Sequence, residues 1–422
     1  MNAVTKGEDR HFPYLGNAPS IRWPFGAVNR CELVIEAALR EVLRNAYFIE
    51  HVRTLKSAGL LPETCVEIGT APEMLTYRNL LRAKKCDRTK PSVLLYPDPP
   101  LGDEEIDVLD DINPDNIVFT TPTAVAAQPD PKATGTPLKS RIIGISISNS
   151  PDLPSRGMSL EHLEDAMVEC ARYLLAQGGS LAYGGDLRPG GFTTILFELA
   201  RSHNRAGSTE RIHNFLAWPI HLRIDTDLWK EYLDEIRSYK ISPPADLGVD
   251  AVNYLAPDDA AGRYAWARSL TVMREEMDRK VDARVLLGGQ VNGFKGKYPG
   301  LLEEALLALR SNKPVYLIGG FGGCTRLIVD TVKGGTPEAF TEAFQQRQDP
   351  LYEGLAARYQ DASSQGRTTA IDYAGELEYL RQRGVGGLNN GLSEAENEVL
   401  FVSRSLPEIV YLLLKGLTQR FT

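Results

Sequence analysis

Residues 180–199 read SLAYGGDLRPGGFTTILFEL, and this stretch decides the fold class. Its first four residues suit a buried strand, four glycines follow between positions 184 and 191, and an apolar helical pattern begins at Phe192. A strand that leads through glycines into a helix is typical of folds in which parallel strands alternate with helices. The stretch therefore predicts an α/β domain with a parallel sheet.

The same alternation continues on both sides of this stretch. Short apolar runs predict further strands at residues 142–147, 215–218, 284–287 and 314–318. Apolar residues at helical spacing predict helices at residues 160–174, 192–200, 266–277 and 300–310. We therefore expect a Rossmann-like, doubly wound, mostly parallel sheet in this part of the chain.

Composition divides the chain into three parts. Residues 1–120 alternate predicted helices at 30–56, 75–84 and 103–111 with predicted strands at 65–69, 92–96 and 117–120. This alternation indicates a small α/β domain that can serve as an effector. Residues 121–139 are rich in Pro, Ala and Thr without a helical or strand period, so we expect a linker there. Residues 140–422 hold the glycine-rich strands and a helical C-terminal extension, in which Ser393 and Glu396 form a capping-box pattern.

Charge and cysteine content exclude several classes of function. Lys and Arg number 47 against 55 Asp and Glu, a net charge of −8, so we expect no sequence-independent nucleic-acid binding. The five cysteines lack a C-x-x-C pair and the six histidines lack metal-ligand spacing, so we expect neither a disulfide framework nor a metal site. The start is polar, and no apolar run approaches the roughly 18 residues of a spanning helix, so we expect a cytoplasmic protein.

Three glycine clusters follow predicted strands of the second domain. In a parallel sheet, ligands bind beyond the carboxyl ends of the strands, where glycine admits a ligand close to the backbone and a helix N-terminus favours phosphate. We therefore predict that the clusters converge around one anionic small molecule. The ligand-binding candidates are Gly184, Gly185, Asp186, Arg188, Gly190 and Gly191 in the first cluster, Gly288, Gly289, Gly300 and Glu303 in the second, Gly319, Gly320 and Gly322 in the third, and Arg268 on the helix at 266–277.

Each cluster also has an interpretation that needs no ligand. Asp186 and Arg188 can form a surface ion pair across a tight turn that the glycines serve. Glu303 and Glu304 can stabilise their helix by complementing its dipole. A scaffold protein whose glycines serve only turns therefore remains an alternative to a ligand-binding protein.

The order of these motifs resembles the SLOG superfamily, the Smf/DprA–LOG group of Rossmann-like domains. Leu181-Ala-Tyr-Gly-Gly-Asp186 is similar to the strand and Tyr-Gly-Gly-Gly turn of the LOG enzymes, and Met273-Arg274-Glu-Glu-Met277 is similar to their Arg-containing helix. Their hallmark P-G-G-x-G-T-x-x-E corresponds here to Leu287-Gly-Gly, an insertion, and Pro299-Gly-Leu-Leu-Glu-Glu304. The resemblance spans roughly residues 141–332, which is less than half of the chain.

The resemblance implies two alternative functions. In LOG enzymes an Arg and the hallmark Glu support cleavage of an N-glycosidic bond in a nucleoside monophosphate, which would make Glu304 and Arg274 catalytic, with Arg268 as the other candidate for the Arg. Leu287 and Leu301 depart from the hallmark Pro and Thr. Related SLOG domains of bacterial immune systems sense nucleotide-derived signals. This favours a homo-oligomer that binds an NAD- or ADP-ribose-type ligand in bacterial defence or signalling, with no further cofactor.

Overall fold

The structure is a computed structural model, and it divides the chain into two compact units. It describes residues 11–12, 21–22, 46, 48–61, 65–67, 92–102, 117–127, 137–185, 191–201, 211–224 and 236–421. One unit comprises Met1–Pro100 and Glu105–Thr134, and the other comprises Leu101–Glu104 and Gly135–Thr422. The main division, between Thr134 and Gly135, falls within the stretch expected to be a linker.

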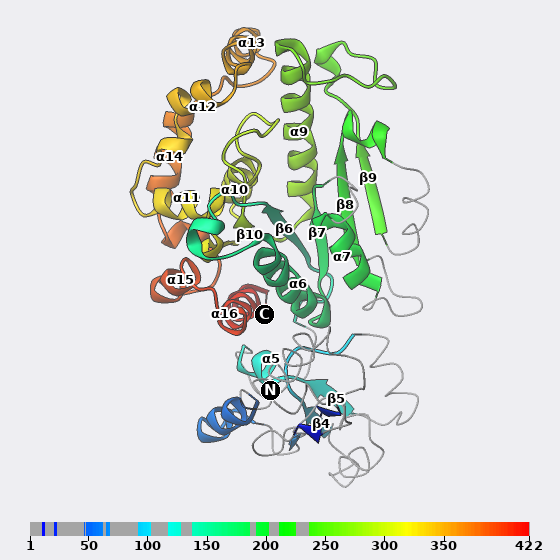
Figure 1. Cartoon of the computed structure of the whole chain (residues 1–422), viewed down its shortest axis with the longest axis vertical. Coiled ribbons are helices and arrows are strands. Elements are labelled where there is room, and N and C mark those ends of the chain that lie inside the picture. The colour runs from blue at the N-terminus through cyan, green and yellow to red at the C-terminus, as the bar shows by residue number, and fades with distance from the viewer. Residues whose placement is uncertain are drawn as a thin grey trace, which may run out of the picture. The chain divides into compact units, whose positions relative to one another are not determined.

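The second unit is built on a six-stranded parallel sheet (Figure 1). Its strands are β6 (Ile142–Ser148), β7 (Ser180–Tyr183), β8 (Ile212–Ala217), β9 (Ile236–Ile241), β10 (Ala283–Gly288) and β11 (Val315–Ile318). They lie in the order β11-β10-β6-β7-β8-β9, and every neighbouring pair is parallel. From β6 the chain first adds strands on one side and then returns to add β10 and β11 on the other, which confirms the predicted doubly wound sheet.

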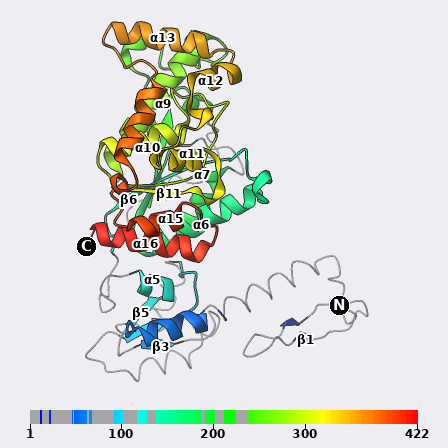
Figure 2. The ribbon, with the colours of Figure 1, turned by 90° about the vertical axis from the view of Figure 1, so that its left-hand side faces the viewer.

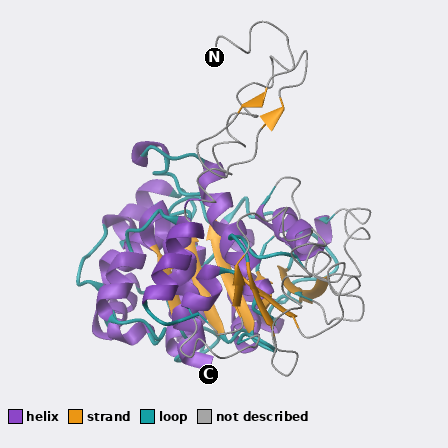
Figure 3. Ribbon diagram, turned by 90° about the horizontal axis from the view of Figure 1, so that it is seen from below, coloured by secondary structure: helices purple, strands orange, loops and turns teal. Residues whose placement is uncertain are grey.

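Helices alternate with these strands and lie on both sides of the sheet (Figure 3). They are α6 (Leu160–Ala176), α7 (Phe192–Arg201), α9 (Ala260–Lys280), α10 (Gly300–Arg310) and α11 (Gly323–Val332). Helix α6 packs against β7, α7 against β8, α9 against β8, and α10 against β10. Crossovers between parallel strands are right-handed. Helices that come before the order of strand addition reverses therefore cover one face of the sheet, and helices that come after it cover the opposite face.

Five further helices form the C-terminal part of this unit (Figure 2). They are α12 (Glu342–Gln348), α13 (Tyr352–Ser364), α14 (Tyr373–Arg383), α15 (Glu394–Leu400) and α16 (Leu406–Phe421). Helix α13 packs on α9, α14 on α11, and α16 on α6. The predicted capping box is present, because the Ser393 hydroxyl accepts from the backbone N–H of Glu396 and the Glu396 carboxylate accepts from that of Ser393. Short 3-10 helices occupy Pro154–Arg156, Ile220–Arg223, Ala245–Leu247, Gly319–Phe321, Glu338–Phe340 and Gly386–Leu388.

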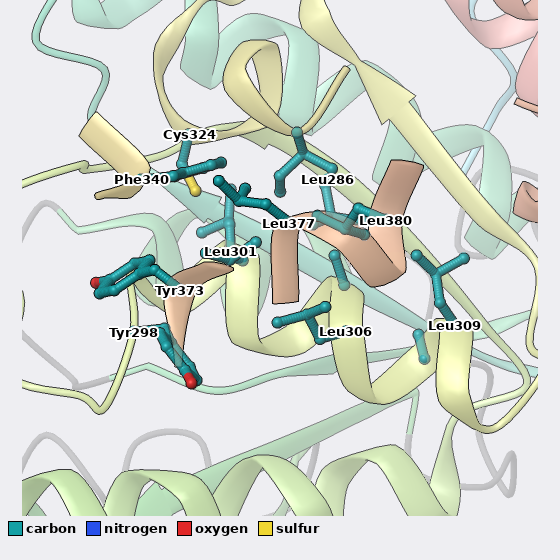
Figure 4. Packing of buried hydrophobic residues seen from close by; sticks show 14 of the residues in the cluster. Leu286, Tyr298, Leu301, Leu306, Leu309, Cys324, Phe340, Tyr373, Leu377 and Leu380 are labelled. Atoms are coloured by element: carbon teal, nitrogen blue, oxygen red, sulfur yellow. The ribbon is translucent and has the colours of Figure 1, made fainter. Parts of the chain in front are cut away.

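A large apolar cluster joins the sheet to the C-terminal helices (Figure 4). Leu301 and Leu306 of α10, Leu286 of β10 and Leu377 of α14 all belong to this cluster. Each of these four side chains is at most 5% exposed. Fully burying one such side chain stabilises the fold by about 1.5–3 kcal/mol, so α10 is anchored firmly where it starts at the edge of the sheet.

The first unit carries a smaller parallel sheet of three strands in the order β3-β4-β5. These strands are β3 (Cys65–Glu67), β4 (Ser92–Leu95) and β5 (Ile117–Thr120), as predicted, and β1 (His11–Phe12) pairs with β2 (Ile21–Arg22) as a separate antiparallel pair. Residues 48–57 are helical, and Phe48, Val52, Leu55 and Leu95 pack in one core with Val125. The predicted helices at 75–84 and 103–111 lie outside the described residues.

The structure differs from the sequence analysis at two places. The stretch expected to be a structureless linker begins with helix α5 (Pro122–Ala126), which Thr121 caps and whose first four residues are buried. Pro at the first position of a helix costs no hydrogen bond, so the proline that indicated a linker instead starts a helix. Strand β9 was not expected, since its polar residues hide the apolar pattern of an edge strand.

Among the described residues, no helix is long and apolar enough to cross a membrane.

Candidate functional site

A cavity of about 270 Å³ opens at the carboxyl ends of three neighbouring strands. Its walls come from the ends of β6, β7 and β8, from α9, and from the loop and helix that follow β10. The order of strand addition reverses between β6 and β10, and the end of β6 and the segment after β10 both line the cavity, which is where open α/β sheets bind ligands. The described residues that line it are Ile147, Ser148, Tyr183, Gly184, Gly185, Phe215, Leu216, Ala217, Ile220, Trp266, Leu270, Met273, Arg274, Gln290, Phe294, Lys295, Gly300, Leu301 and Glu304.

The first glycine cluster meets helix α9 at this cavity. Gly184 and Gly185 both line it. A Cβ atom on Gly184 would lie 3.1 Å from the side chain of Met273, so glycine lets α9 approach the end of β7 closely. Gly191 lies at the start of α7 and is not among the lining residues. Asp186, Arg188 and Gly190 lie outside the described residues.

Arg274 of α9 lies directly against the start of α10. A Cβ atom on Gly300 would lie 2.8 Å from Nη2 of Arg274, and one on Gly296 would lie 2.7 Å from its Nη1. The two glycines therefore leave the room that the guanidinium occupies. Arg274 is 8% exposed, and its Nε has no hydrogen-bond partner in the described part of the chain. The structure thus places four of the candidate residues, Gly184, Gly185, Arg274 and Gly300, at one cavity.

Glu304 reaches the cavity from the second turn of α10. Its Oε2 accepts hydrogen bonds from Nη1 of Arg284, at 2.7 Å, and from the hydroxyl of Ser146. Its Oε1 lies 3.5 Å from Nε of Arg274, too far and too poorly directed for a hydrogen bond. Oε2 of Glu304 is therefore held by Ser146 and Arg284, and Oε1 lies beside the cavity.

Glu303 does not line the cavity but holds Arg274 in place. One of its carboxylate oxygens accepts from Nη1 of Arg274 and the other from the hydroxyl of Thr271. Glu303 and Arg274 are 5% and 8% exposed, so this ion pair is buried, whereas Thr271 is half-buried. With Arg284 and Glu304, these residues form a buried cluster of two guanidiniums and two carboxylates whose formal charges balance.

Arg268, the other predicted arginine, is not among the lining residues. Its two Nη atoms donate to the carboxylate of Asp246 at 2.9 and 3.0 Å, and Nη1 also donates to the hydroxyl of Tyr264. Burial alone would lower the pKa of Arg268, but the hydrogen bonds to Asp246 and Tyr264 outweigh burial and raise that pKa. Arg268 therefore joins α9 to Asp246, in the segment before that helix.

The third glycine cluster packs against the protein itself. Gly319 and Gly320 lie against the backbone of Phe401 and Ser403, and Gly322 against the side chains of Asp152 and Arg156. The carboxylate of Asp152 accepts a hydrogen bond of 2.8 Å from the N–H of Gly323 at the start of α11.

The third cluster nevertheless meets the second. The carbonyl of Gly289 accepts from the N–H of Cys324 at 2.8 Å, and Gly288 and Gly289 both have positive φ angles, 65° and 108°. None of Gly288, Gly289, Gly319, Gly320 and Gly322 is among the residues that line the cavity. The second cluster contributes to the cavity through Gly300 instead.

The sequence reasoning missed the aromatic wall and the deepest arginine. Phe215, Trp266 and Phe294 line the cavity, yet in the sequence they look like ordinary core residues. Arg284 is fully buried on β10, between β11 and β6. Its position within the apolar run Ala283–Gly288 was a usable signal, because a buried strand carries a charged residue only where a partner meets it.

The chain is similar to a described protein family and to a solved structure. The family model described as SLOG cluster2 matches residues 137–400, which is more than half of the chain. An X-ray structure of TM1055, a target of the Northeast Structural Genomics Consortium, is similar at 18% sequence identity and a TM-score of 0.26, over 45% of this chain and 81% of that one. No curated protein matches the chain.

Proposed function

The chain belongs to the SLOG cluster2 family, and on that premise we propose that its cavity binds a nucleotide-derived small molecule of the NAD or ADP-ribose type. The observation that carries the proposal is the meeting of Gly184, Gly300 and Arg274 at one cavity beyond the parallel strands. Arg274 lines that cavity, is nine-tenths buried, and has an Nη2 that lies against Gly300. Its guanidinium can therefore donate to an anionic ligand in the cavity.

The start of α10 is the proposed phosphate site. Pro299 precedes the helix and provides no side-chain cap, while Gly300 and Leu301 of the first turn line the cavity. The first N–H groups of a helix lack partners within the helix, and the helix dipole is positive at that end. A phosphate placed there would accept from these N–H groups with Arg274 beside it.

The aromatic and aliphatic wall is the proposed base site. Phe215, Ile220, Trp266 and Leu270 face the same cavity as Phe294. Trp266 is fixed in orientation because its Nε1 donates to the carbonyl of Leu255 at 2.6 Å. A planar base can stack on such side chains, which contributes about 1–3 kcal/mol per base. A volume of about 270 Å³ suits one nucleotide unit, so the rest of a larger ligand would extend from the cavity.

Calorimetry with the full chain tests the proposal. The panel is AMP, ADP-ribose, cyclic ADP-ribose and NAD, each titrated into the wild type, Phe294→Ala and Phe344→Ala. Phe344 is a matched control, because it is also half-buried but does not line the cavity. We expect at least one member to bind, about tenfold more weakly to Phe294→Ala and unchanged to Phe344→Ala. Absence of binding by the whole panel would refute the proposal.

A second function, hydrolysis of a nucleotide N-glycosidic bond, is favoured by the geometry of Glu304. Its Oε1 lies beside the cavity while its Oε2 is held by Ser146 and Arg284, so the carboxylate can face a ribosyl cation in a defined position. The chemistry would be stabilisation of that cation by Glu304 and fixation of the phosphate by Arg274.

Product analysis tests this second function. Wild-type protein incubated with nucleoside monophosphates or NAD should release free base, measured by chromatography. Glu304→Gln should abolish release while still binding the nucleotide, because the amide can keep the hydrogen bonds from Ser146 and Arg284. Release that survives the substitution would reject Glu304 as the catalytic carboxylate.

In a signalling or defence role, ligand binding by the second unit would change the activity of the first unit or the assembly of a homo-oligomer. Light scattering of the full chain with and without the ligand found above measures the assembly. An unchanged mass at protein concentrations up to tens of micromolar would contradict a ligand-driven oligomer.

A further inference from the structure

The loop between β10 and α10, residues 289–299, brings three side chains to the cavity. Strand β10 ends at Gly288 and helix α10 starts at Gly300, so eleven residues connect them, whereas such loops commonly have about two to six. Gln290, Phe294 and Lys295 of this loop line the cavity. The insertion that separates this chain from the LOG hallmark therefore forms part of the site.

Two buried cations hold the loop in one conformation. Arg263, which is 1% exposed, donates to the carbonyls of Phe294 at 2.6 Å, of Lys295, and of Gly296 at 3.4 Å. The ammonium of Lys297 donates to Oγ1 and to the carbonyl of Thr369, at 2.7 and 3.0 Å. Arg263 and Lys297 thus have hydrogen-bond partners within the protein. Together they fix the backbone that carries Lys295.

Lys295 is the cation of this loop that the fold does not use. It is exposed, it lines the cavity, and within the described part of the chain its ammonium makes no ion pair or hydrogen bond. The other charged lining residues there are Arg274 and Glu304, whose charges are balanced within the buried cluster with Glu303 and Arg284. Lys295 therefore supplies the unbalanced charge at the rim of the cavity.

We propose that Lys295 selects ligands with a second phosphate, so that the cavity prefers nucleoside diphosphates and their esters to nucleoside monophosphates. This inference rests on the proposed function and extends it. The first phosphate lies on the N–H groups of α10 beside buried Arg274, and the next group of the ligand points outward to the rim. There the exposed ammonium attracts a second phosphate, which a monophosphate cannot offer.

Calorimetry with AMP and ADP tests the inference, since these ligands differ only in the second phosphate. We expect the wild type to bind ADP about tenfold more tightly than AMP. Lys295→Met should remove most of that difference by weakening ADP binding, and should leave AMP binding within about twofold. Lys295→Arg should keep the preference. Lys139→Met is the matched control, because Lys139 is also exposed but does not line the cavity.

The outcomes separate this inference from the proposed function. Equal affinities of the wild type for AMP and ADP, or an equal loss of both in Lys295→Met, would overturn the role of Lys295 while nucleotide binding stands. Failure of AMP, ADP and the earlier panel to bind would overturn both. Lys295 is exposed and its backbone is held by Arg263, so the variants should unfold at the wild-type temperature, which a thermal melt checks.

Discussion

Replacing Arg284 by Met should destabilise the second unit strongly, and adding Glu304→Gln should recover much of the loss. Nη1 of Arg284 lies 2.7 Å from Glu304 Oε2, and the arginine has no exposed surface. Unit charges about 4 Å apart at an effective dielectric constant of about 20 attract by about 4 kcal/mol. Removing one partner of a buried pair typically costs about 3–5 kcal/mol, because the other charge stays buried.

The pair should therefore behave non-additively in a double-mutant cycle. We expect Arg284→Met to lower the free energy of unfolding by about 3 kcal/mol, at the low end because Ser146 and Arg274 remain beside Glu304. In the double variant the uncompensated carboxylate is gone, so the loss should be smaller than the sum of the single losses by about 2 kcal/mol.

Urea denaturation followed by tryptophan fluorescence measures these energies. Trp218, Trp229 and Trp266 lie in the second unit and only Trp23 in the first, so the signal reports mainly on the unit of interest. Losses in the single variants that add within about 0.5 kcal/mol in the double variant would refute the reasoning, since they would mean that Arg284 and Glu304 do not interact.

Two further predictions concern the start of α10 and the buried thiols. Gly300→Ala should weaken nucleotide binding severalfold in calorimetry, because its Cβ would lie 2.8 Å from Nη2 of Arg274 and displace it. Gly386→Ala is the control, since a Cβ there meets nothing within 4 Å; equal effects would contradict a role for Arg274. Cys170 and Cys324 are buried, and burial raises both pKa values, that of Cys170 from 9.0 to about 12. Both thiols should resist alkylation in the native protein, as peptide mapping can show. Since the unfolded thiols ionise first, stability should fall as pH rises from about 9 to 12, and a urea midpoint that stays constant there would contradict this.

Most of the second unit's fold follows from local pattern in the sequence. Short apolar runs bounded by glycine and proline predicted five strands of its sheet, because a strand buried on both faces needs apolar residues throughout. The pattern failed at β9, an edge strand with polar residues, and at α5, where proline starts a helix instead of marking a linker. In both places a residue's position within the fold outweighed its average preference.

The sequence alone also determined which parts of the chain can approach a ligand, since glycine and a helix start have the same local geometry in any fold. Only the tertiary structure decided which of them meet. Gly184, Gly300 and Arg274 come together because β7 ends and α10 begins at the same edge of the sheet, and α9, which carries Arg274, passes beside both. Gly319 and Gly320, with an equally suggestive local sequence, are covered by the backbone near Phe401. Among the described residues the ammonium of Lys295 has no partner, whereas Arg263 donates to the carbonyls of Phe294 and Lys295. Such partners are distant in sequence from the charged side chain, and only folding brings them close.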